Sequence, residues 1–175
     1  MVTVEREERF ERVARAVIEP VRRFVTRRTR LDVVDDVLAD TLVVLWRRLD
    51  EVPEDPVPYA YAVARRCLAN TERAARRQTR VAGKVARLDP PREAEPEPLD
   101  DPELAMALAS LPPDDREVLR LWAWEQLEPR EIAAVLDLTA NTAAARLSRA
   151  KRKLALALRH DRDASGHEGA GGRDG

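Results

Sequence analysis

The sequence predicts an all-α protein of two small helical domains joined by an acidic, proline-rich linker. Apolar residues recur every three or four positions through most of the 175 residues, which is typical of amphipathic helices. Residues 81–101 break this pattern with six acidic side chains, four prolines and little that could be buried. Near the C-terminus, two short helical segments separated by about three residues indicate a helix-turn-helix. We therefore expect domains at 1–80 and 102–160, the linker between them, and a disordered, glycine-rich tail at 161–175.

Three helices are predicted in the N-terminal domain. The first spans about 5–28, as one helix or as two that meet at a bend near Pro20. The second begins after "RTRLD" and keeps helical apolar spacing to Leu49. The third runs from about Pro58 to Arg77. The segment "DEVPEDPVP" is predicted to be a loop, because three prolines cannot continue a helix.

The C-terminal domain is predicted to contain four helices. A short one covers 104–111, and "PDDREVLRLWAWEQ" follows with acids in its first turn, where they favour helix initiation. "EPREIAAVLDL" has Pro129 at a plausible first position, and Thr139 is the expected N-cap of the last helix. The last two helices have the spacing of a helix-turn-helix, whose second helix would enter the major groove. An ordinary helical hairpin with a basic end fits the same periodicity.

Composition argues against several classes of protein. The single cysteine, Cys67, excludes an internal disulfide, fits a reducing cytoplasm and is expected to be buried. No stretch approaches the roughly 20 apolar residues that span a bilayer, and the N-terminus has no signal-peptide run, so we expect a cytoplasmic protein without a membrane partner. The sequence offers no glycine-rich phosphate loop, metal-ligand cluster or nucleophile–base set. We therefore expect no enzyme activity, no cofactor and no metal.

Basic residues gather in two places, although the formal net charge is only −1. Six arginines fall within 65–80, where Glu72 is the one acid, and a second group lies between Arg146 and Lys153. Such clusters can neutralise nucleic-acid phosphates. They can equally be solvated helix faces.

Short motifs follow one another in a defined order through the C-terminal half. They are Leu-Pro-Pro at 111–113, Arg-Glu-Val-Leu at 116–119, Glu-Ile-Ala at 131–133, Thr142, Arg-Leu at 146–147 and Arg-Ala-Lys at 149–151. This order resembles the C-terminal DNA-binding domain of bacterial RNA polymerase sigma factors, in the extracytoplasmic-function group of the sigma-70 family. Residues 34–49 are similar to that family's polymerase-binding helix, and residues 58–80 to the helix that melts and reads the −10 element. The resemblance covers about residues 8–158.

The chain departs from the family pattern at three places in the helix-turn-helix. Glu128-Pro129 stands where a serine is usual before Glu-Ile-Ala. Asp137 stands where a glycine is common before the turn. Ala143-Ala144-Ala145 replaces the usual Val-Lys-Ser at the start of the second helix.

The resemblance implies a role for three sets of residues. Contacts to the −35 element would come from Asn141, Thr142, Ala144, Ala145, Arg146, Arg149, Lys151, Arg152 and Lys153, with Arg149 the first choice for base readout. Contacts to the −10 element would come from Tyr59, Arg65, Arg66, Asn70, Arg73, Arg76 and Arg77. Core polymerase would bind Asp36, Asp40, Leu45 and Trp46. The size of Trp46 favours a core position for it. For Tyr59 and Tyr61, a position in the core is as compatible with the sequence as a contact to DNA is.

The implied function is that of a sigma factor that directs promoter-specific transcription initiation. Its partners would be core RNA polymerase and promoter DNA, with an anti-sigma factor as a further candidate. On the polymerase, it would contact the clamp of the β′ subunit and the flap of the β subunit. Two alternatives stay open. One is a helix-turn-helix regulator that acts without core polymerase. The other is a sigma-like decoy that binds proteins without productive promoter recognition. The alanine-rich first turn of the second helix is compatible with this alternative, because alanine offers no hydrogen bonds to bases.

Overall fold

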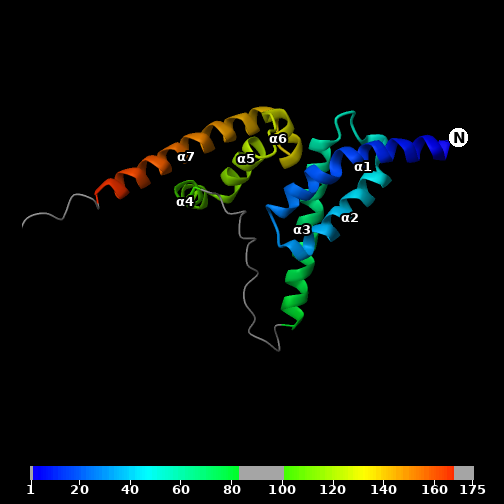
Figure 1. The fold of residues 1–175 in the computed structure, drawn as a ribbon, viewed down its shortest axis with the longest axis horizontal. Coiled ribbons are helices and arrows are strands. Elements are labelled where there is room, and N and C mark those ends of the chain that lie inside the picture. Colours follow the sequence, from blue (N-terminus) through cyan, green and yellow to red (C-terminus); the bar gives the residue numbers. More distant parts are fainter. Residues whose placement is uncertain (1, 83–100, 168–175) are drawn as a thin grey trace, which may run out of the picture. The chain divides into compact units, whose positions relative to one another are not determined.

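The computed structural model describes residues 2–82 and 101–167, and within these ranges all regular structure is helical (Figure 1). This confirms the predicted all-α class. The chain forms two compact units, the first built from α1, α2, η1 and α3 and the second from α4, α5, α7 and most of α6. Most of the predicted linker, 83–100, lies outside the described residues. None of the described helices is long and apolar enough to cross a membrane.

Three long helices, α1 (Val2–Thr26), α2 (Leu31–Arg47) and α3 (Val57–Ala82), build the first unit. Their apolar stripes pack against one another, since burial of apolar surface is the main favourable term in folding. Buried Thr41 donates its hydroxyl to the carbonyl of Val37 at 2.7 Å, which leaves no unmade hydrogen bond at this polar core position. The core side chains of this unit include Val17, Val21, Phe24, Val25, Val34, Val37, Leu45, Leu49, Ala60, Tyr61 and Ala64.

Of the two forms predicted for the first helix, the structure has the single one. α1 continues through Pro20, and the side chains of Val17, Val21 and Phe24 on either side are buried in the core. The predicted loop at 50–58 is shorter than expected. A 3₁₀ turn, η1 (Leu49–Glu51), occupies its start, and α3 already begins at Val57. Pro58 is compatible with this start, because the first N–H groups of a helix have no intrahelical partner.

Four helices form the second unit: α4 (Pro102–Ser110), α5 (Pro113–Ala123), α6 (Pro129–Leu136) and α7 (Ala140–His167). α4, α5 and α6 each have proline in the first turn, where its fixed φ favours the helix. The Asp101 carboxylate caps α4 by accepting the Glu103 and Leu104 N–H groups at 2.9 and 3.2 Å. The core of this unit includes Ala107, Leu111, Val118, Leu119, Leu121, Leu127, Ile132, Ala133, Ala143, Leu147 and Ala150.

The last helix is longer than the sequence predicted. The tail was expected to begin at Asp161, but α7 continues to His167. The first glycine of this segment is Gly166, so nothing before it interrupts the helical backbone. Residues 168–175 of the predicted tail lie outside the described residues.

Candidate nucleic-acid interface

The chain reverses direction between α6 and α7 in a three-residue turn. Asp137 ends α6 in the left-handed conformation, with φ 57° and ψ 49°. The Leu138 N–H donates to the carbonyl of Ala133 at 2.9 Å, which closes the C-terminus of α6. The Thr139 hydroxyl then accepts the Thr142 N–H at 3.2 Å and caps the start of α7, as predicted. Helix, turn and helix therefore follow in the expected order.

Packing fixes which face of α7 is turned inward. Ala143, Leu147 and Ala150 are buried, and their spacing of four and three residues places them on one side of the helix. The two alanines allow α7 to approach its neighbours closely. The opposite side of the first three turns must therefore face outward.

The outward face of α7 combines polar, small and basic side chains, all of them exposed. Among the residues that the structure describes, neither Arg149 nor Arg152 makes an ion pair. Ser148 was not among the predicted contacts, although it lies one turn after Ala144 and seven residues after Asn141. That spacing could have identified it from the sequence. The face consists of Asn141, Thr142, Ala144, Ala145, Ser148, Arg149 and Arg152.

Three other basic residues of α7 contact α5. The Arg146 guanidinium lies 3.5 Å from an Asp114 carboxylate oxygen, and Lys153 Nζ lies 2.5 Å from Asp115 Oδ2. The Lys151 ammonium lies 3.5 Å from the centroid of the Trp122 ring, a cation–π contact. The basic residues predicted to contact the −35 element therefore separate into two groups, one that contacts α5 and one, Arg149 and Arg152, that faces outward.

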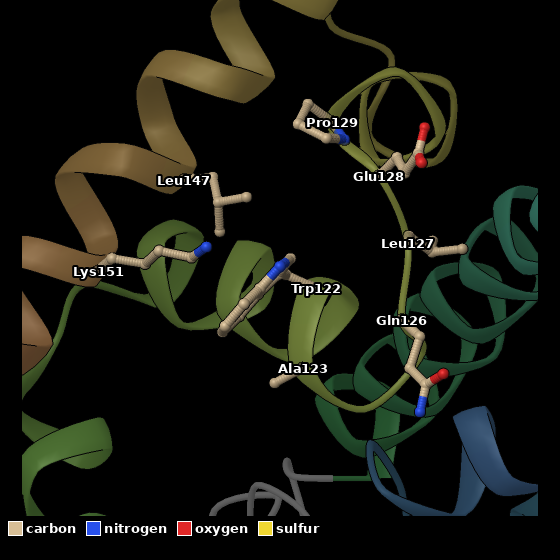
Figure 2. Close-up of a pocket in the computed structure, with 8 residues that line it drawn as sticks. All are labelled: Trp122, Ala123, Gln126, Leu127, Glu128, Pro129, Leu147 and Lys151. Atoms are coloured by element: carbon tan, nitrogen blue, oxygen red, sulfur yellow. The ribbon is translucent and has the colours of Figure 1, made fainter.

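A depression of about 530 Å³ lies where Lys151 meets Trp122, within the second unit. Figure 2 shows the lysine side chain extending toward the indole, with Leu147 between the two helices. Backbone and side chains of the segment that joins α5 to α6 form the rest of its wall. The lining residues are Trp122, Ala123, Gln126, Leu127, Glu128, Pro129, Leu147 and Lys151.

The basic side of α3 is accessible along much of its length. Arg65, Arg66, Arg76 and Arg77 are exposed, as is Arg73. Arg73 donates to the Asn70 side-chain oxygen at 2.7 Å, so these two predicted contacts are already joined to each other.

The two tyrosines of α3 have different surroundings. Tyr61 is buried and stacks on Phe24 with ring centroids 4.9 Å apart, which makes it a core residue. Tyr59 is half-buried, so part of its side chain is accessible.

The residues predicted to bind polymerase divide between surface and core. Asp36 and Asp40 are exposed on α2. Leu45 is fully buried, so its assignment as a surface contact is wrong: its apolar spacing serves the helix core. Trp46 is 36% exposed, contrary to the core position that its size favoured. Its indole packs edge-on against Phe10 at 5.1 Å, and the Arg6 guanidinium lies 5.2 Å from the indole ring.

Cys67 is buried, as predicted. Burial raises the pKa of its thiol, an effect that the nearby Asp40 charge reinforces and a hydrogen bond with Thr41 opposes. The protonated thiol is a weak nucleophile, which fits a packing role. No group of three or more potential metal ligands occurs in the described part of the chain.

Fold and surface together define a helix-turn-helix protein with an accessible, partly basic second helix. Residues 102–154, which contain this motif, match the family model described as sigma-70, region 4. No curated protein sequence matches the chain.

Several solved structures are similar to most of the chain. One is the sigma factor RpoE from Bartonella quintana in complex with the anti-sigma factor NepR, with 22% identity over 86% of this chain and 96% of that one and a TM-score of 0.61. Another is CnrH in complex with the cytosolic domain of CnrY, with 25% identity over 87% of this chain and 88% of that one and a TM-score of 0.52. A third is the PhyRSL–NepR complex from Sphingomonas sp. Fr1, with 18% identity over 74% and 76% and a TM-score of 0.50.

Residues 102–154 therefore form a helix-turn-helix domain of the sigma-70 region 4 type, a DNA-binding domain of sigma factors. Over most of its length the chain is similar to solved sigma-factor structures, so its resemblance to the extracytoplasmic-function group is confirmed.

Proposed function

We propose that this chain is a sigma factor that binds core RNA polymerase and directs initiation at promoters that it reads with α7 and melts with α3. The observation that carries the proposal is the outward face of α7, which joins polar side chains and two arginines free of ion pairs within the described residues. This face lies in the segment that matches sigma-70 region 4.

Readout of the −35 element would use the front of α7. An arginine can donate two hydrogen bonds to guanine O6 and N7, and Arg149 has the exposure for this role. Asn141 and Thr142 lie at the helix N-terminus, where N–H groups also attract phosphate. Ala144 and Ala145 can contact thymine methyl groups but add no hydrogen bonds, so DNA shape would contribute to the preference.

Melting of the −10 element would use the exposed side of α3. Its arginines form a basic track that a single DNA strand can follow, because backbone phosphates are attracted regardless of sequence. Asn70 and Tyr59 are the candidates for contacts to unstacked bases. Of the two tyrosines, Tyr59 is the accessible one.

Polymerase would bind the first unit through the exposed acids Asp36 and Asp40 of α2, with the partly exposed Trp46 further along the same helix as an additional candidate. The clamp of the β′ subunit is the proposed partner there, and the flap of the β subunit is the proposed partner of the second unit. Because the similar Bartonella sigma factor was solved with an anti-sigma factor, we include an anti-sigma factor among the candidate partners.

Run-off transcription with the full chain, bacterial core polymerase and a library of genomic promoter fragments tests the proposal. We expect discrete transcripts that require both the chain and the core enzyme. Operator binding by the chain alone, without transcripts, would instead indicate a plain regulator. Polymerase binding without transcripts would indicate a decoy.

A further inference from the structure

We infer that the ion pair between Asp115 and Lys153 positions the recognition helix α7, so that Lys153 is a positioning residue and the neighbouring Arg152 is the phosphate contact. The inference rests on the proposed promoter recognition and divides its basic residues into two roles. It starts from the contrast between adjacent side chains. Lys153 contacts an acid of α5, whereas Arg152 makes no ion pair within the described residues.

The carboxylate of Asp115 makes this pair difficult to give up. Its side chain is 11% exposed, whereas that of Lys153 is 49% exposed, and Nζ lies 2.5 Å from Oδ2. A buried carboxylate without a cation carries an uncompensated desolvation cost. If Lys153 turned toward DNA, that charge would be left unpaired beside a polyanion. The lysine therefore stays with α5 when DNA binds.

A second pair sets the geometry. Arg146 and Asp114 lie 3.5 Å apart, so two successive acids in the first turn of α5 hold two points of α7 seven residues apart. Seven residues are about 10 Å along a helix, and two such points resist rotation of α7 about its axis. A rotation by one residue, about 100°, would carry Arg149 off the outward face.

The first experiment needs no DNA. Amide hydrogen exchange of the full chain is measured for Lys153→Met, with Arg152→Met as the matched control one residue away. In Lys153→Met, we expect the amides of the first turns of α7 to exchange roughly 5- to 100-fold faster, the range that an unpaired buried polar group costs. Arg152→Met should leave them unchanged, and Lys153→Arg should restore slow exchange. Equal exchange in the two methionine variants overturns the inference.

The second experiment counts phosphate contacts. Affinity of the full chain for a random-sequence duplex of about two helical turns is measured as a function of salt. Removing one phosphate contact lowers the slope of log K against log salt by about 0.9. We expect this decrease for Arg152→Met and an unchanged slope with weaker binding for Lys153→Met. A slope that falls equally in Lys153→Met shows a phosphate contact and overturns the inference.

Failure of the proposed function gives a different result. If the unmodified chain binds no duplex and yields no transcripts, promoter recognition is wrong. The exchange measurement then still decides whether Asp115 and Lys153 hold α7 in place.

Discussion

Lys151 holds its ammonium 3.5 Å from the centroid of the Trp122 ring, so a basic side chain of the recognition helix rests on an aromatic face of α5. Trp122 is nonetheless 43% exposed. A large aromatic side chain this open is unusual for a pure core residue, and its contact with the lysine accounts for its position.

We predict a measurable coupling between these two side chains. In a double-mutant cycle with Lys151→Met and Trp122→Leu, the free energies of unfolding should differ from additivity by about 0.5–1 kcal/mol, the range for exposed cation–π pairs. Chemical denaturation of the four proteins provides the measurement. Strict additivity would show that the contact contributes nothing to stability.

The left-handed backbone of Asp137 predicts a stabilising substitution. Asp137→Gly should raise the stability of the second unit, because a side chain in the left-handed conformation costs roughly 1–2 kcal/mol and glycine avoids this cost. The gain is smaller than that figure, because glycine loses more backbone entropy on folding than aspartate does. Calorimetry should show a melting temperature a few degrees higher. Ala144→Gly, inside α7, is the control and should lower stability by about 1 kcal/mol. A lower melting temperature for Asp137→Gly would contradict the strained turn.

Loss of Arg149 should change sequence preference. Arg149→Ala removes a candidate bidentate contact to guanine, which contributes about 1–3 kcal/mol to base discrimination. Selection from randomised −35 duplexes, in complex with core polymerase, should show relaxed preference at one or two positions. Arg152→Ala is the comparison and should weaken binding to all sequences alike. Unchanged preference in Arg149→Ala would remove this residue from base readout.

The basic side of α3 predicts a defect in promoter melting. Combined replacement of Arg66, Arg76 and Arg77 by alanine should reduce open complexes at least about tenfold, since charge-assisted hydrogen bonds contribute about 1.5–3 kcal/mol each. Permanganate footprinting of the −10 region detects unpaired thymines directly. Arg12→Ala, an exposed arginine of α1, is the matched control. Footprints equal to that control would contradict the assignment.

Substitutions on α2 should separate binding from folding. Asp36→Lys with Asp40→Lys should abolish capture of core polymerase without changing thermal stability, because both acids are exposed. Glu7→Lys with Glu19→Lys makes the same charge change on α1 and should not affect capture.

Leu45→Ala, by contrast, should destabilise the first unit by about 2–5 kcal/mol, because Leu45 is fully buried. Urea denaturation measures this loss.

The charge-reversal prediction is checked by a pull-down of core polymerase. If the Asp36→Lys, Asp40→Lys variant captures as much polymerase as the unmodified chain does, polymerase binds elsewhere.

Local chemistry explains which elements could be predicted. Thr139 and Pro129 signalled helix starts through short-range backbone preferences, and the structure has α7 and α6 beginning there. Trp46 and Leu45 illustrate the limit of periodicity. Both follow the apolar pattern of α2, yet one is buried and the other partly exposed, because the position of α1 decides how far the covered stripe extends.

The helices, the helix-turn-helix and the resemblance to sigma factors could be predicted from the sequence, because capping, periodicity and motif order are properties of neighbouring residues. The contacts of the basic side chains of α7 could not be predicted in this way. In the folded protein, Arg146, Lys151 and Lys153 contact α5, while Arg149 and Arg152 face outward. The physical reason is pairing at a distance: Asp114, Asp115 and Trp122 lie roughly thirty residues earlier, and only folding brings their charge and aromatic surface to α7.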